Sequence, residues 1–200
     1  MTLYEIKPQF QALLRPLVKT LAATGVSANQ VTLSAAVVSV VLGGFIYVNA
    51  DVTAVFLLIP AWLFLRMALN AIDGMLAREF DQKSTLGAYL NELGDVVSDA
   101  ALYLPFALVA PFSNLTVVLV VLLATLSEFA GAFGPTVGAS RRYDGPMGKS
   151  DRALVFGVLG LWLGIAGSLP LWLFWLMPLL SVLLVMTTFN RVQHALVEAN

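Results

Sequence analysis

The chain has 200 residues, of which 59% are hydrophobic and only 12% are charged, and its net charge is -1. Soluble domains carry about 25% charged residues, so this composition excludes an ordinary soluble protein and indicates a single membrane domain. The absence of cysteine excludes disulfides, thiolate metal sites and cysteine nucleophiles. The near-zero net charge gives no indication of a nucleic-acid partner.

The N-terminal segment predicts an amphipathic helix that lies on the cytoplasmic surface of the membrane. Its apolar residues recur at three- and four-residue steps, with basic residues between them; they are Leu3, Ile6, Phe10, Leu13, Leu14, Leu17 and Leu21. Pro8 and Pro16 indicate bends, and a mobile tail is the competing interpretation. We expect residues 1–24 to form this juxtamembrane helix and residues 25–200 to form the transmembrane domain.

Six apolar stretches follow, and a helix that spans a bilayer needs about 20 mostly apolar residues. They are Val31–Val48, Thr53–Ile72, Leu86–Val109, Leu115–Thr136, Ala153–Ala166 and Leu171–Phe189. The fifth is short, and turn-forming residues separate several of the others. The predicted fold is therefore an all-α integral membrane protein, with six transmembrane helices preceded by an N-terminal interfacial helix.

The lysines and arginines predict the orientation of these helices. Of the 11 basic residues, all but Arg66 lie in the N-terminal segment, the second loop, the fourth loop or the C-terminal segment. Loops enriched in Lys and Arg stay in the cytoplasm. We therefore expect a multi-pass protein of the cytoplasmic (inner) membrane with both termini in the cytoplasm.

Polar residues interrupt the end of the second predicted span and the start of the third. The residues that share a helical face are Arg66, Asn70, Asp73 and Ala77 on the second span, and Gly87, Asn91, Asp95 and Asp99 on the third. Ionisable groups inside a membrane are costly and usually mark function, and carboxylate and amide oxygens suit a hard cation such as Mg²⁺. The competing interpretation is a polar packing seam whose charge is neutralised by Arg66 or Arg78.

The stretch from Asn70 to Asp95 resembles the signature of the CDP-alcohol phosphatidyltransferase family, D-x-x-D-G-x-x-A-R-x8-G-x-x-x-D-x-x-x-D, and every spacing matches. The fixed residues that this chain keeps are Asp73, Gly74, Ala77, Arg78, Gly87 and Asp95. Asn70 and Asn91 replace the first and third Asp of the signature. The family also has six membrane helices after an amphipathic N-terminal helix. The opening MTLYEIKP and the stretch GKSDRA are similar to a bacterial subgroup of it.

The resemblance implies a membrane transferase of phospholipid biosynthesis. In the family, an acceptor hydroxyl attacks the β-phosphorus of a CDP-linked alcohol such as CDP-diacylglycerol, and CMP leaves. It further implies a small or lipid alcohol as acceptor, contact with membrane lipids, and a homodimer.

The family's site residues carry over to this sequence position by position. One or two Mg²⁺ or Mn²⁺ ions would be held by Asp73, Asp95, Asn70 and Asn91, and Asp95 would also be the catalytic base. The nucleotide and pyrophosphate would be bordered by Gly74, Ala77, Arg78 and Gly87, together with Asn29 and Thr32, which belong to a stretch similar to the family's Pro-Asn-x-x-Thr. For Asn29, the competing interpretation is the N-cap of the first span.

The two Asn substitutions leave several interpretations open, because an amide oxygen can bind a hard cation but adds no charge. The site could use one ion, or take the second only with the donor pyrophosphate. Glu92 or Asp99 could compensate for the lost charge. Alternatively, the chain has lost catalysis and binds nucleotide lipid or a partner without turnover. A small transporter is disfavoured, because no inverted repeat is visible in the sequence.

The fourth loop carries a second group of cations, Arg141, Arg142 and Lys149. One interpretation is a pocket for a phosphate of the acceptor or donor, since the family binds phosphorylated acceptors with basic residues in this region. The other is ordinary loop charge on the cytoplasmic side, attracted to anionic lipid headgroups.

Overall fold

The computed structural model describes the backbone of residues 3–200 and the side chains from residue 9 onward, so the predicted apolar positions Leu3 and Ile6 lie outside the described side chains. The described chain is helical throughout, without a strand, which confirms the all-α prediction. The α-helices are α1 (Leu3–Ala23), α2 (Ala28–Val48), α3 (Leu58–Glu79), α4 (Thr85–Tyr103), α5 (Asn114–Phe133), α6 (Lys149–Ala166) and α7 (Leu176–Ala199). Short 3₁₀ segments are η1 (Thr53–Leu57), η2 (Leu104–Leu108), η3 (Gly134–Val137) and η4 (Leu171–Trp175).

Four helical segments are long and apolar enough to cross a membrane: Ala28–Val48, Thr53–Glu79, Asn114–Val137 and Leu171–Ala199. The other two predicted spans correspond to α4 and α6, and each of these helices carries three charged residues. Their sequences are therefore less apolar than those of the four, although both helices pack inside the same bundle. The six-span count stays a prediction.

The third predicted span is shorter as a regular helix than the apolar pattern indicates. Leu86–Val109 divides into α4, which ends at Tyr103, and the 3₁₀ segment η2. Pro105 lies in the first turn of η2, and proline has no N–H to continue an α-helical hydrogen-bond ladder. The second predicted span is extended instead, because α3 continues to Glu79 and carries the whole polar stretch from Arg66 onward on one helix.

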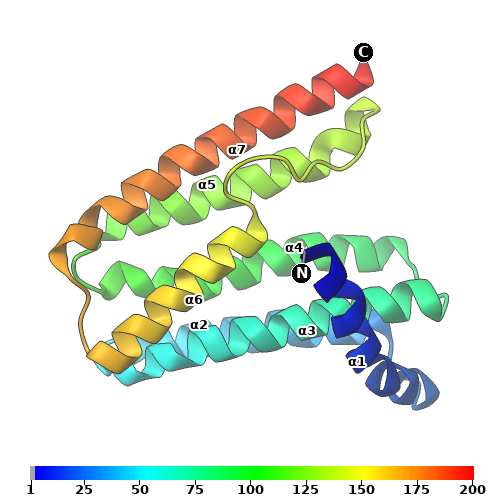
Figure 1. Ribbon diagram of the computed structural model, residues 1–200, viewed down its shortest axis with the longest axis horizontal. Coiled ribbons are helices and arrows are strands. Elements are labelled where there is room, and N and C mark those ends of the chain that lie inside the picture. The colour runs from blue at the N-terminus through cyan, green and yellow to red at the C-terminus, as the bar shows by residue number, and fades with distance from the viewer. Residues whose placement is uncertain (1–2) are drawn as a thin grey trace.

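The helices form two groups, which meet where α4 and η2 pack against α5 (Figure 1). α5 and α7 run side by side along one flank, while α2, α3 and α4 lie together along the other, and α6 crosses between them. α1 lies across α3, and it occupies the same end of the bundle as the C-terminus and the α3–α4 loop. α3 and α4 therefore both pack against α2, and the loop that joins them lies at the end of the bundle that carries α1.

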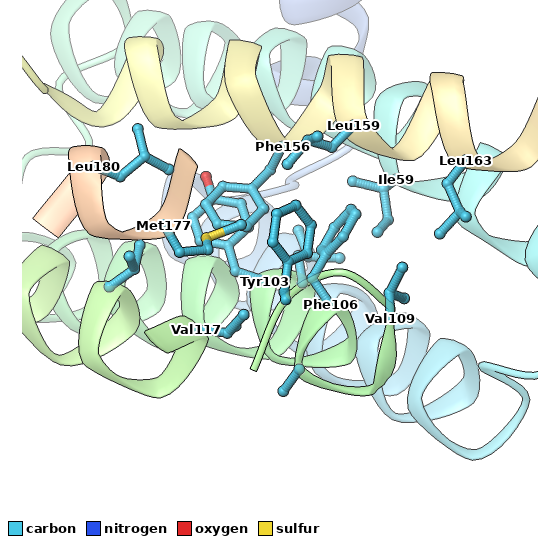
Figure 2. Packing of buried hydrophobic residues seen from close by; sticks show 14 of the residues in the cluster. Ile59, Tyr103, Phe106, Val109, Val117, Phe156, Leu159, Leu163, Met177 and Leu180 are labelled. Atoms are coloured by element: carbon cyan, nitrogen blue, oxygen red, sulfur yellow. The ribbon is translucent and has the colours of Figure 1, made fainter. Parts of the chain in front are cut away.

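A large apolar core fixes α6 against the end of α4 and the η2 segment that follows it (Figure 2). Tyr103 at the end of α4 stacks on Phe156 of α6 with ring centroids 3.9 Å apart, and Phe106 packs against Phe156 at 5.3 Å. These rings are fully buried. Gly43 allows α2 to pack closely against α4, because a Cβ at this position would lie 2.2 Å from the Ala101 carbonyl oxygen. Both contacts hold α4 in place, and α4 carries half of the predicted site.

Candidate active site

A cavity of about 430 Å³ lies between α2, α3, α4 and the α3–α4 loop. Pockets that bind small ligands typically have volumes of about 300–1,000 Å³. The lining residues are Ala28, Asn29, Thr32, Asn70, Asp73, Gly74, Ala77, Arg78, Gln82, Lys83, Ser84, Gly87, Ala88 and Asn91. We call this the donor cavity, after the CDP-linked donor that the sequence resemblance assigns to these residues. It brings together every residue that was expected to border the nucleotide, from three helices.

Asp73 is the one carboxylate among the described residues that line the donor cavity. Its exposed fraction is 7%, and the Thr32 hydroxyl donates a 2.7 Å hydrogen bond to Asp73 Oδ2. Asn70 on α3 and Asn91 on α4 line the same cavity. One carboxylate and two amides therefore supply the oxygen atoms at this place.

The start of α2 contributes polar groups because its N-cap is Ser27, so the interpretation of Asn29 as the N-cap is wrong. Ser27 Oγ accepts a 3.2 Å hydrogen bond from the Gln30 N–H. The Asn29 side chain is left to reach α4, where its Nδ2 donates to Ser84 Oγ at 3.3 Å. A Cβ at Gly87 would lie 2.6 Å from Asn29 Oδ1. The glycine of the signature is therefore needed here for the close approach of α2 to α4.

The donor cavity is cationic. Arg78 and Lys83 line it, and within the described side chains neither forms an ion pair with a carboxylate. The Arg78 guanidinium lies over Gly74, where an added Cβ would come within 3.1 Å of Nη1 and Nη2. Two cations face one carboxylate, so the cavity favours an anion.

Asp95 lies elsewhere. It is one helical turn beyond Asn91, about 6 Å farther along α4 at about 1.5 Å per residue, and it is not among the cavity-lining residues. Arg66 Nη2 donates to Asp95 Oδ1 at 3.0 Å, and Lys149 Nζ forms an ion pair with Asp95 Oδ2. Both carboxylate oxygens are thus engaged by cations. Asp95 thus takes part in a packing seam of the kind that the sequence left open, and its role as catalytic base stays a prediction.

Asp95 belongs to a larger set of ion pairs that we call the ion-paired centre. Its cations are Arg66, Arg141, Arg142, Lys149, Arg152 and Arg191, and its carboxylates are Glu92, Asp95, Asp99, Glu128, Asp144 and Glu198. It extends from α3 and α4 through the fourth loop to α7. The set has two parts that share no ion pair. In one, Arg142 pairs with Asp144 and Glu198; in the other, which contains Asp95, five cations share four carboxylates.

The buried part of the ion-paired centre is held by arginines that each contact two groups. Arg66 contacts Asp99 at 2.6 Å as well as Asp95, and Arg152 contacts both Asp99 at 3.1 Å and Glu128 at 3.0 Å. Arg191 donates to the Ser127 carbonyl oxygen at 2.5 Å and lies 3.4 Å from Glu128. Paired charges are tolerated inside a membrane, whereas an isolated charge is costly.

The remaining predicted site residues also belong to the ion-paired centre. Glu92 pairs with Arg141, and Asp99 with two arginines, so neither compensating candidate lines the donor cavity. Arg142 Nε contacts Asp144 at 2.8 Å, and its Nη1 contacts Glu198 at 2.5 Å.

The residues of this centre that the sequence did not single out include two buried arginines. Arg152 and Arg191 are each only 2% exposed, although counting charges by loop assigned both to cytoplasmic helix ends. Each of these arginines lies at the end of a predicted apolar span, and this position was the available signal that its side chain could turn into the bundle.

The residues present do not fit a centre of two metal ions. Among the side chains that the structure describes, residues 9–200, no group of three or more His, Cys, Asp or Glu is placed to hold a metal ion. Asp95, the second carboxylate of the signature, is engaged by Arg66 and Lys149. The oxygens of Asp73, Asn70 and Asn91 do suit one hard cation, since Mg²⁺ is commonly bound by one or two carboxylates and the substrate phosphates.

The fold has close relatives among solved structures, although no protein-family model matches the chain. One is the Mycobacterium tuberculosis phosphatidylinositol phosphate synthase PgsA1 in complex with manganese and citrate, with a TM-score of 0.73, 19% sequence identity and coverage of 90% of this chain and 87% of that chain. The same synthase with CDP-DAG bound gives a TM-score of 0.72 at 19% identity and covers 90% of this chain and 92% of that one. The chain is thus an all-helical membrane protein with the fold of this synthase.

Sequence relatives define the family more narrowly. The chain is 50% identical over 200 residues to the inner membrane protein YnbA of Escherichia coli (strain K12), covering 98% of this chain and 97% of that protein. It is 32% identical over 192 residues to an uncharacterized protein of Aquifex aeolicus (strain VF5), covering 94% and 91%. The chain belongs to the family of the inner membrane protein YnbA.

Proposed function

We propose that this protein is a CDP-alcohol phosphotransferase, which moves a phosphatidyl or phospho-alcohol group from a CDP-linked donor to an acceptor hydroxyl and releases CMP. The observation that carries the proposal is the donor cavity, where Asp73, Arg78 and Asn91 meet at the spacing of the transferase signature. The shared fold with a synthase solved with CDP-DAG bound supports a CDP-linked lipid as donor.

Within the donor cavity, we assign the pyrophosphate to Arg78 and Lys83, the cations without a carboxylate partner among the described side chains. Gly74 and Gly87 leave room beside Arg78 and Asn29, so the donor can approach the helix backbones. One Mg²⁺ or Mn²⁺ would be held by Asp73, Asn70 and Asn91 and would supply charge neutralisation of the pyrophosphate when bound. Ala77 and Thr32 complete the wall.

The transfer forms a bond between the acceptor oxygen and the β-phosphorus and breaks the bond from that phosphorus to the CMP oxygen. The acceptor loses its hydroxyl proton, and we assign this proton to Asp95, one turn from the cavity residue Asn91. Lys149 must first leave Asp95 Oδ2, because that oxygen is now ion-paired. Phosphoryl transfer relies mainly on positioning and charge stabilisation, so Arg78 and Lys83 contribute most of what the protein supplies.

The membrane arrangement belongs to the same proposal. We place residues 1–24 on the cytoplasmic surface and residues 25–200 across the inner membrane as six spans, in which α4 and α6 complete the four apolar segments. Both termini are then cytoplasmic. A homodimer is part of the family resemblance and stays a prediction.

A second function is favoured by one observation. Because Asp95 is held by Arg66 and Lys149, the protein could hold nucleotide lipid without turning it over. Release of CMP from CDP-diacylglycerol, measured with purified protein in mixed micelles, separates the two. Transfer predicts CMP release that is lost in Asp73→Ala and in Asp95→Asn. Binding alone predicts no CMP, together with CDP binding that Asp73→Ala weakens and Asp95→Asn leaves unchanged.

A matched control for these variants is Asp51→Ala, because Asp51 lies in the turn between α2 and η1 and lines no part of the donor cavity. We expect it to retain wild-type CMP release and CDP binding. Wild-type protein that neither binds CDP nor releases CMP, across donors and acceptors, would overturn the proposal.

A further inference from the structure

We propose that one water molecule is bound inside the bundle, in a small cavity between α4, α5 and α6. The cavity has a volume of about 10 Å³, which is about the least space that holds a water molecule and too little for a larger ligand. It is lined by Asp99 and Tyr103 of α4, Thr125 and Glu128 of α5 and Arg152 of α6, together with apolar residues of α4 and α5. We call this the water cavity.

Two residues of the water cavity carry a buried polar atom that has no hydrogen-bond partner in the described part of the chain. The atoms are Tyr103 Oη and Arg152 Nε, and among the described residues only Arg141 Nε shares this condition. Tyr103 is fully buried and Arg152 is 2% exposed, so bulk water does not reach either side chain. Buried polar groups in proteins are bonded to protein or to ordered water. Two such atoms beside one cavity therefore indicate a ligand that bonds to both.

A water molecule matches the chemistry of these two groups. The Arg152 Nε–H can only donate, so its partner must offer a lone pair, as a water oxygen does. The Tyr103 hydroxyl can donate to the same oxygen or accept one of the water protons. The carboxylates of Asp99 and Glu128, which line the same cavity, are acceptors for the remaining protons. The cavity thus supplies the roughly three polar partners that a buried water usually has.

The charges around the water cavity disfavour an ion in the same place. A cation would lie against the Arg152 guanidinium, and an anion would lie against the carboxylates of Asp99 and Glu128. Like charges brought together in a buried site are strongly unfavourable, because little solvent screens them. A neutral molecule of the smallest size meets neither repulsion.

This water joins the apolar core to the ion-paired centre. The Tyr103 ring stacks on Phe156 in the core (Figure 2), while Arg152 Nη2 contacts Asp99 and Glu128 in the centre. A bridge from the Tyr103 hydroxyl to Arg152 Nε completes the hydrogen bonding on the inner edge of the guanidinium. It therefore helps to hold Arg152 in the orientation that pairs it with both carboxylates.

A high-resolution crystal structure of the wild-type protein observes the site directly. We expect density for one water oxygen within hydrogen-bond distance of both Tyr103 Oη and Arg152 Nε. An empty cavity, direct protein partners for both atoms, or density for a larger group would each overturn the inference. None of these outcomes depends on whether the protein is a transferase.

The sign of a stability change tests the same inference in solution. Tyr103→Phe removes the hydroxyl and keeps the ring that stacks on Phe156. If the hydroxyl is bonded to a water, its loss should lower the unfolding midpoint in detergent by about 2–4 °C. If the hydroxyl has no partner, its removal relieves the cost of burying it, and the midpoint stays the same or rises. Tyr89→Phe is the matched control, because Tyr89 lies on the same helix and is 67% exposed, and it should keep the wild-type midpoint. A midpoint of Tyr103→Phe equal to or above that of Tyr89→Phe counts against the bound water.

Discussion

The donor cavity and the ion-paired centre are neighbours on the same helices, yet they use charge in opposite ways. α4 contributes Asn91 to the cavity and, one turn later, Asp95 to the centre. In the cavity, Arg78 and Lys83 have no carboxylate partner among the described side chains and can act on a ligand. In the centre, every cation is paired with a carboxylate, so its charges hold helices together. The proximity of an ionisable residue to a site therefore says little about its role until its partners are known.

The largest effect that separates the two regions is expected from Glu128→Gln. Glu128 lies 3.0 Å from Arg152 and 3.4 Å from Arg191, two arginines that are each 2% exposed. Removing one partner of a buried pair typically costs about 3–5 kcal/mol, because the other charge stays buried. Denaturant or thermal unfolding in detergent measures the loss.

The control for this variant is Glu79→Gln, which removes the same charge from an ion pair whose side chains are 46% and 36% exposed. Exposed pairs contribute little to stability, because water and salt screen their attraction. Equal unfolding midpoints for the two variants would show that the ion-paired centre does not stabilise the bundle.

The second-largest effect is expected from a packing change between α2 and α4, the helices that line the donor cavity. Gly43→Ala places a Cβ 2.2 Å from the Ala101 carbonyl oxygen and forces α2 away from α4. Overpacking of this kind costs about 1–3 kcal/mol, and it should also weaken CDP binding, because both helices line the donor cavity. Gly44→Ala is a close control, since a Cβ there meets nothing within 4 Å. Both effects are measured by thermal unfolding and by CDP titration, and identical behaviour of the two variants would contradict the close α2–α4 contact.

At the proposed metal site of Asp73, Asn70 and Asn91, substitutions should increase metal affinity. Asn70→Asp or Asn91→Asp adds a carboxylate beside Asp73, and each should tighten Mn²⁺ binding by about tenfold, because hard cations prefer charged oxygen ligands. Electron paramagnetic resonance of free Mn²⁺ gives the affinity and stoichiometry without any need for turnover. Asn49→Asp, at the C-cap of α2, serves as the control. If neither cavity variant changes Mn²⁺ affinity, Asp73 and its neighbours are not a metal site.

The sequence predicted the donor cavity better than the ion-paired centre. The reason is that the cavity residues are close together in the chain, whereas the ion pairs join residues that are far apart in it. Asn70, Asp73 and Ala77 lie on one face of α3 by helical periodicity alone, and Gly87 and Asn91 do the same on α4. The pairing of Lys149 with Asp95 joins residues far apart in the chain, and it depends on how α6 is rotated against α4. No local pattern contains that rotation.

For the same reason, the sequence did not predict that Arg152 and Arg191 are buried. The density of Lys and Arg near helix ends indicates which side of the membrane a loop occupies, but it does not show whether a given side chain points outward or into the bundle. Arg152 and Arg191 point inward, toward Glu128. Four-residue spacing likewise grouped Asp95 and Asp99 with Asn91, although each step also moves about 6 Å along the helix. Asp95 and Asp99 therefore lie deeper than the cavity.

The smallest effect concerns the outer edge of the ion-paired centre, in the loop before α6. Hydrogen bonds from Arg142, and then from His194, lower the pKa of Asp144 from 3.8 to about 2. Since the folded pKa is depressed, the stabilising contribution is present above pH 3.8 and is lost as the pH falls toward 2. Asp144→Asn should flatten the stability profile in that window and leave it unchanged near neutrality apart from a constant offset. The side chain is 27% exposed, so the change is small beside that of Glu128→Gln. Unfolding midpoints across pH 2–5 measure it, and an unaltered slope in the variant would assign the acid sensitivity to the carboxylates inside the bundle.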